Sequence, residues 1–94
     1  MEEIEELIKN GNPTIIDVRT PGEFMSGHAA GSINIPLNEI PARVEELKSY
    51  PDVILCCASG ARSAQAQGFL MNHGIETLNA GPWLNVNYLI NNKI

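Results

Sequence analysis

The sequence predicts a three-layer α/β fold, in which a four-stranded parallel sheet is covered by helices on both faces. Short β-branched or apolar stretches alternate along the chain with segments whose apolar residues recur at helical spacing. The stretch from Val53 to Cys56 is apolar throughout, as is typical of a central parallel strand that is covered on both faces. The chain has 94 residues, of which 44% are hydrophobic and 18% charged, and we expect one domain over residues 1–94.

Turn and capping signals set the boundaries of the expected elements. Thr20, Pro21 and Glu23 form a capping box with proline at the first helical position. Asn38 is a candidate cap for the next helix. The expected strands cover residues 14–18, 32–35, 53–56 and 75–79. The expected helices cover residues 2–10, 20–27, 38–50, 61–73 and 83–91.

The segment after the central strand carries the candidate chemistry. The strand ends at Cys56 and Cys57, a run of small residues follows, and Arg62 opens the next helix. Small side chains let the backbone curl into a cup of inward N–H groups at a positive helix end, which stabilises a thiolate and binds an anion. The candidate site comprises the nucleophile Cys57, the anion-binding Arg62, and the substrate-binding loop residues Ala58, Ser59, Gly60, Ala61 and Ser63. The plainer alternative is that both cysteines are small buried residues without reactivity.

Charge and cysteine usage argue against several other classes of protein. A net charge of −5 and scattered basic residues argue against nucleic acid or a membrane surface as a partner. No stretch approaches the roughly 20 apolar residues of a membrane span. The acidic residues 1–6 are unlike a signal peptide, so we expect a cytoplasmic protein. Two adjacent cysteines are neither a disulfide framework nor a zinc site, and no metal is expected.

Two motifs together resemble those of the rhodanese-like sulfurtransferase family. Residues 57–63, Cys-Ala-Ser-Gly-Ala-Arg-Ser, are similar to the family's active-site loop, Cys-x-x-Gly-x-Arg-Ser. Residues 17–19, 23–24, 27–28 and 31–36 resemble, in the same order, the family's Asp-Val-Arg, Glu-Phe, Gly-His and Gly-Ala-x-Asn-Ile-Pro. The resemblance covers nearly the whole chain and identifies it as a single-domain member of that family.

The resemblance implies a sulfurtransferase that works through a persulfide, with thiosulfate:cyanide sulfurtransferase activity. Cys57 would take sulfane sulfur from a small anionic donor such as thiosulfate and pass it to cyanide, a thiol or a protein acceptor. The resemblance implies no cofactor, assigns Asp17 and Arg19 to bracing the site, and makes His28 a scaffold residue. Five strands are common in the family, whereas this chain begins at the first helix. We therefore expect four strands in the spatial order fourth, third, first, second. We also expect the protein to be a monomer.

Two rival functions share these residues. Counted from Cys56, the loop reads Cys-x5-Arg, the pattern of cysteine-dependent phosphatases, although Leu55 stands where such phosphatases generally carry histidine. The other rival is a rhodanese-like module that only binds partners. Ala58 stands where thiosulfate-using members often carry a basic residue, which leaves the donor open. Trp83 lies after the last strand, where it could line the pocket mouth or pack in the core.

Overall fold

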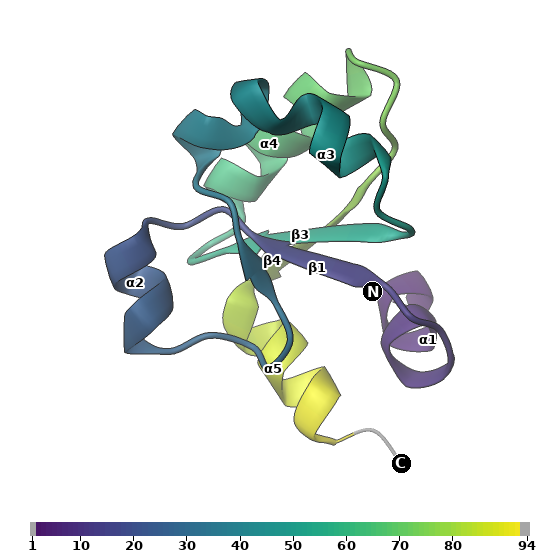
Figure 1. The fold of residues 1–94 in the computed structure, drawn as a ribbon. Helices are drawn as coiled ribbons and strands as arrows, with labels where there is room; N and C mark the ends of the chain where they lie inside the picture. The colour runs from purple at the N-terminus through teal and green to yellow at the C-terminus, as the bar shows by residue number, and fades with distance from the viewer. Residues whose placement is uncertain (1, 93–94) are drawn as a thin grey trace.

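The computed structural model describes residues 2–92, which fold around a four-stranded parallel sheet (Figure 1). The strands are β1 (Thr14–Asp17), β2 (Ile33–Asn34), β3 (Val53–Cys57) and β4 (Leu78–Pro82), in the spatial order β2-β1-β3-β4. Neighbouring strands all pair in parallel, so their carboxyl ends meet at one edge of the sheet. The predicted fold class and strand order are confirmed.

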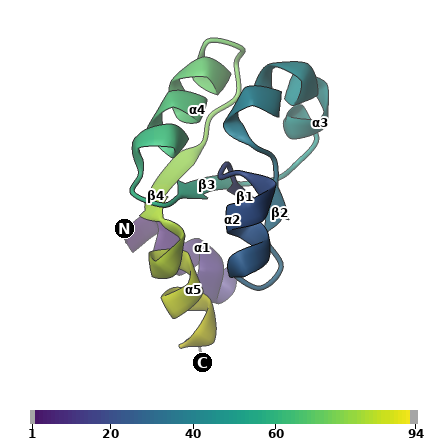
Figure 2. The same cartoon turned by 90° about the vertical axis from the view of Figure 1, so that its left-hand side faces the viewer.

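Helices cover both faces of the sheet and so make three layers (Figure 1). A 3₁₀ helix, η1, lies with α3 and α4 on one face, while α1 and α5 lie on the other. The short helix α2 follows β1 and stands beside the carboxyl edge of the sheet, which faces the reader in Figure 2. The bounds are α1 Glu2–Asn10, α2 Pro21–Ser26, η1 Leu37–Arg43, α3 Val44–Lys48, α4 Ala61–Met71 and α5 Trp83–Asn91.

The side chains of β3 alternate between two hydrophobic clusters, one on each side of the sheet. Val53, Leu55 and Cys57 belong to the cluster under η1, α3 and α4, and Ile54 and Cys56 belong to the cluster with α1 and α5. All five side chains are buried, as expected of a central strand. Because successive side chains of a strand point to opposite faces, the two adjacent cysteines enter different environments.

The fourth strand lies later in the chain than its apolar pattern predicts. Strand β4 begins at Leu78, whereas the prediction began at Ile75. Gly74 has a φ of +80° and ends the preceding helix, and the Ile75 N–H donates to the Leu70 carbonyl oxygen at 2.9 Å. Ile75 is buried and packs at the C-terminal end of α4. Its apolar side chain therefore belongs to the helix end and not to a strand.

The helix predicted over residues 38–50 is also wrong in type over its first half. Leu37–Arg43 form the 3₁₀ helix η1, and only Val44–Lys48 are α-helical. Pro36 precedes η1 and provides no side-chain cap, and the cap predicted at Asn38 is absent, because that residue lies inside η1. Pro41 has no N–H to donate, which disfavours regular α-helical bonding across this segment. The other element boundaries differ from the prediction by at most a few residues.

Candidate active site

Cys57 is the last residue of β3 and lies beneath the turn that leads into α4. Its side chain is fully buried. The Gly60 N–H donates to Cys57 Sγ at 2.9 Å, and the Ser63 Oγ lies 3.4 Å from the same sulfur. The turn from Cys57 to Ser63 therefore surrounds the sulfur with hydrogen-bond donors.

Burial and hydrogen bonding act in opposite directions on Cys57. Burial raises the pKa of this thiol, because it disfavours the charged form. The Ser63 hydroxyl and the backbone N–H groups of Ser63, Gly60 and Ser59 together outweigh burial, and the pKa of Cys57 lies below its ordinary value of 9.0. A lowered pKa increases the share of thiolate, which is the nucleophilic form of cysteine.

Cys56 is in a different position, although it is the neighbouring residue. It is fully buried in the cluster on the other side of the sheet, where it packs with residues of α1 and α5. Burial, followed by the nearby charge of Asp17, raises the pKa of Cys56 to about 12. A thiol that is buried, protonated and turned away from the loop is a poor nucleophile. This geometry therefore disfavours Cys56 as the nucleophile that the phosphatase pattern requires.

The turn depends on the backbone conformation of Gly60 and on the small size of its other residues. Gly60 precedes α4 with a φ of +107°, a conformation that glycine adopts at little cost. A Cβ at Gly60 would lie 3.2 Å from the Cα of Gly81, so the loop and β4 approach each other closely. The side chains of Ala58, Ser59 and Ala61 are exposed. With these three side chains exposed, the sulfur is lined by backbone N–H groups of the turn and by the Ser63 hydroxyl.

Arg62 lies in the first turn of α4, but its guanidinium is paired with Glu23 of α2. Nη1 donates to Oε1 at 2.7 Å and Nη2 donates to Oε2 at 3.0 Å. This bidentate pair ties α2 to α4, and about a third of each side chain is exposed. The sequence predicts that Arg62 binds an anionic substrate, and in the structure its guanidinium pairs with the Glu23 carboxylate.

We expect the Glu23→Gln variant to lose an acid-sensitive part of the stability of the fold. Hydrogen bonds from Arg62 lower the pKa of Glu23 from 4.5 to about 2. A carboxyl with a lowered folded-state pKa stabilises the fold above its unfolded pKa and loses that effect as the pH falls through the folded pKa. The difference in melting temperature between wild type and variant should be constant above about pH 5 and shrink toward pH 2. A difference that does not vary over this window contradicts the ion pair.

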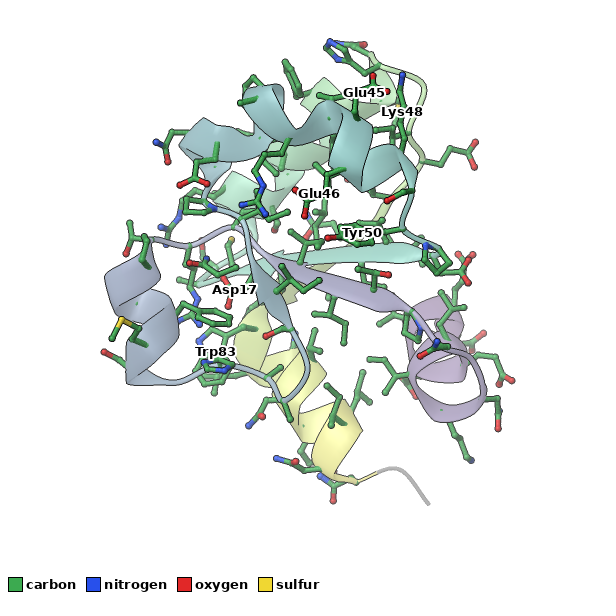
Figure 3. The ribbon with its side chains drawn as sticks, in the orientation of Figure 1. Asp17, Glu45, Glu46, Lys48, Tyr50 and Trp83 are labelled. Carbon is green, nitrogen blue, oxygen red and sulfur yellow. The ribbon has the colours of Figure 1, made fainter. Side chains whose placement is uncertain are left out.

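Asp17 and Arg19 form a second ion pair, which is buried at the end of β1, where Asp17 lies in register with Cys56 of β3. The Arg19 Nη2 lies 2.7 Å from Asp17 Oδ2, and Arg19 Nε donates to both carboxylate oxygens at 3.0 Å. Arg19 also donates to the Gly27 carbonyl oxygen at 2.7 Å, and its guanidinium lies 4.7 Å from the ring centroid of Trp83. Asp17 and Trp83 are labelled in Figure 3. These contacts join the end of β1 to the segment after α2 and to α5. These contacts hold the end of β1 in place, and Trp83 packs against the Arg19 guanidinium.

Sequence reasoning omitted two residues that contact the loop. Glu23 is predicted from the sequence as part of a capping box and of a family motif but not as a partner of Arg62, which lies 39 residues away in the chain. Asn79 of β4 contacts Ser63 and Gly60, at separations of 16 and 19 residues. The available signal is position, since Asn79 lies on a strand that ends at this edge of the sheet and Glu23 lies in the helix that follows another such strand.

Two wider observations concern residues 2–92. No helix there is long and apolar enough to cross a membrane. The same residues contain no group of three or more His, Cys, Asp or Glu side chains arranged to hold a metal ion.

The parallel sheet and the cysteine turn at its carboxyl edge define an α/β protein with a thiolate-stabilising loop. Residues 1–82 match the family of the rhodanese-like domain, and the chain belongs to that family.

Relatives of this chain include proteins named for sulfur transfer. A sulfurtransferase from Allochromatium vinosum is 40% identical over 70 residues, which cover 74% of this chain and 65% of that protein. Thiosulfate sulfurtransferase 16 from Arabidopsis thaliana is 37% identical over 71 residues, which cover 63% of this chain and 59% of that protein. A tRNA uridine(34) hydroxylase from Hamiltonella defensa is 28% identical over 82 residues, which cover 81% of this chain and 23% of that protein. The chain thus spans less than two thirds of the length of each of these relatives.

Solved structures support the same family. A rhodanese from E. coli superposes with a TM-score of 0.71 at 32% identity, over 79% of this chain and 91% of that chain. The reduced CoADR-RHD protein of Bacillus anthracis gives a TM-score of 0.77 at 35% identity, over 95% of this chain and 16% of that chain. The chain is therefore a rhodanese-like domain with sulfurtransferases among its relatives.

Proposed function

We propose that this protein is a sulfurtransferase that carries sulfane sulfur on Cys57 as a persulfide. One observation carries the proposal. The buried Cys57 Sγ accepts the Gly60 N–H at 2.9 Å and lies 3.4 Å from the Ser63 Oγ, in surroundings that lower the pKa of the thiol. Anionic sulfur is thereby favoured, both as the attacking thiolate and as a bound persulfide.

The first half-reaction loads the sulfur. The Cys57 thiolate attacks the outer sulfur of a donor such as thiosulfate and forms a new S–S bond. The S–S bond of the donor breaks, and sulfite leaves with the bonding electron pair. The persulfide that results retains the negative charge on its outer sulfur, where the N–H groups of the turn can stabilise it.

The second half-reaction unloads the sulfur. The acceptor is cyanide, a thiolate or a protein thiolate, and it attacks the outer sulfur of the persulfide. The S–S bond to Cys57 breaks, and the thiolate leaves with its electron pair and is ready for the next cycle. Each step exchanges one bond to sulfur for another, so neither a metal nor an organic cofactor takes part in the proposed cycle.

The charges around the cysteine turn bear on the choice of donor. The positive charge of Arg62 is paired with Glu23, and Ala58, which directly follows Cys57, carries no charge. Attraction of the donor then depends on the N–H groups of the loop and on the N-terminus of α4. We propose a small sulfane donor and a thiol, cyanide or protein acceptor, used by a monomer in the cytoplasm.

A parallel assay tests the proposed function. The protein is supplied with thiosulfate, or with a persulfide of a small thiol, and cyanide, and formation of thiocyanate is measured. Hydrolysis of a phenyl phosphate ester is followed on the same sample. We expect thiocyanate with at least one sulfur donor and no release of phosphate. Release of phosphate without thiocyanate would favour the phosphatase alternative, and neither product would favour a module that only binds partners.

A further inference from the structure

Asn79 of β4 lies at the centre of a hydrogen-bond cluster behind the cysteine turn. Its Oδ1 accepts the Gly81 N–H at 2.9 Å and lies 2.7 Å from the Ser63 Oγ. Its Nδ2 donates to the Gly60 carbonyl oxygen at 3.3 Å. One side-chain amide on the edge strand therefore contacts Ser63 and Gly60, two of the residues whose groups reach the Cys57 sulfur.

The orientation of the Asn79 amide is fixed by its partners. The Gly81 N–H can only donate and the Gly60 carbonyl can only accept, so Oδ1 must face Gly81 and Nδ2 must face Gly60. Oδ1 is then an acceptor for the Ser63 hydroxyl, and an amide in the reverse orientation would lose both backbone contacts. The amide thus contacts the same Ser63 Oγ that lies beside the sulfur.

The Ser63 hydroxyl has one proton and three acceptors within reach. Its Oγ lies 2.7 Å from Asn79 Oδ1, 3.1 Å from the Gly60 carbonyl oxygen and 3.4 Å from Cys57 Sγ. Ser63 is fully buried, so water does not compete for this proton. When Cys57 is a neutral thiol, the hydroxyl can donate to Asn79. When Cys57 is a thiolate, the ionised sulfur becomes the stronger acceptor, and the proton can turn toward it without movement of the oxygen.

We propose that Asn79 is a positioning residue that holds the Ser63 hydroxyl beside Cys57 and so supports the thiolate. The proposal rests on the proposed function, because Asn79 is assigned to the Cys57 sulfur that would carry the persulfide. The property that Asn79 affects is the ionisation of the Cys57 thiol. Without the amide, Ser63 can turn to other rotamers and the Gly60 carbonyl loses a donor. The sulfur then keeps fewer hydrogen bonds, and its thiolate becomes less stable.

The charged groups around the turn are held by partners other than Asn79. Arg62 of α4 is paired with Glu23 of α2, and Arg19 is paired with Asp17 at the end of β1. The ion pairs and hydrogen bonds of these four side chains are made without Asn79. A change at Asn79 therefore reaches the sulfur by way of Ser63 and Gly60.

Thiol alkylation tests this proposal without a sulfur donor. In a Cys56→Ala background, the rate of reaction with iodoacetamide is measured against pH for four proteins. These are the parent, Asn79→Ala, Ser63→Ala and the double variant. We expect Asn79→Ala to shift the profile to higher pH and to slow alkylation at pH 7 by about threefold to tenfold, the size expected for the loss of one ordinary hydrogen bond. The slowing in the double variant should be smaller than the combined effect of the two single variants, because both changes act in part through the Ser63 hydroxyl.

Gln67→Ala is the matched control. Gln67 lies one turn beyond Ser63 on α4, and its amide also ties α4 to the chain before β4, by donation to the Thr77 carbonyl oxygen at 2.9 Å. Among the described residues its side chain makes no hydrogen bond with the turn, and its removal should leave the alkylation profile unchanged. If Asn79→Ala does not fold, Asn79→Ser serves instead, because it keeps a polar group beside Gly81 but is too short to reach Ser63.

Two results would overturn the positioning role. One is an unchanged alkylation profile in a folded Asn79 variant. The other is an additive effect of Asn79→Ala and Ser63→Ala, which would show that the two residues act independently. Because alkylation needs no sulfur donor, failure of the proposed sulfur transfer would leave a positive result standing. Conversely, additivity would remove the role of Asn79 and leave the sulfur-transfer proposal intact.

Discussion

Replacement of Cys57 by serine is expected to abolish sulfur transfer, with a loss of rate of at least about a thousandfold. The serine hydroxyl is a much weaker nucleophile than the thiolate that the turn supports, and it cannot carry a persulfide. The measurement is thiocyanate formation from a sulfane donor and cyanide, at fixed enzyme concentration, with folding checked by thermal melting.

The matched control is Cys56→Ala. Cys56 is buried on the opposite side of the sheet, and the pKa of its thiol is raised to about 12, so its removal should leave the transfer rate within a few fold of wild type. The two variants together decide whether Cys57 or Cys56 is the nucleophile. Loss of activity in a folded Cys56→Ala protein, with activity kept in Cys57→Ser, would reverse the assignment of the nucleophile.

The largest effect on stability is expected for Asp17→Ala. Asp17 is fully buried and pairs with Arg19, of which only 5% is exposed. Loss of the carboxylate leaves a buried guanidinium without its counter-ion, which typically costs about 3–5 kcal/mol. The total stability of a domain of this size is about 5–14 kcal/mol. Thermal melting should therefore show a fall of about 12 °C or more.

Glu45→Gln is the control for this prediction. Glu45 also forms an ion pair, with Lys48 at 3.3 Å, but both side chains are well exposed to solvent (Figure 3). Exposed pairs of this kind contribute about 0–1 kcal/mol, so the melting temperature should hardly change. If Asp17→Ala melts as Glu45→Gln does, the Asp17–Arg19 pair is not the brace that its burial indicates.

Local patterns in the sequence were sufficient to predict most of the fold. The apolar run of β3, the capping box at Thr20 and the alternation of strands with helices are all expressed within short segments. The two clear errors arose where local patterns compete. Ile75 has strand propensity but closes a helix end, and Pro41 lies in a helical pattern but favours a 3₁₀ turn.

The site was predicted in part for the same reason. The turn from Cys57 to Ser63 is one continuous segment, so its chemistry can be inferred from residue type and order. The pairing of Arg62 with Glu23 and the contact of Asn79 with Ser63 depend on which strands are neighbours and on their register. Such contacts are set by tertiary structure, and no pattern within a short window of sequence specifies them.

The most direct test of the account is the mass of the protein after exposure to a sulfane donor. Wild type, Cys56→Ala and Cys57→Ser are incubated with thiosulfate or a small-molecule persulfide, and intact masses and peptide masses are recorded before and after reduction. The account predicts one added sulfur atom on Cys57 in wild type and Cys56→Ala, removed by a reductant or by cyanide, and none in Cys57→Ser. An unmodified Cys57 with every donor, or an added sulfur on Cys56, would contradict it.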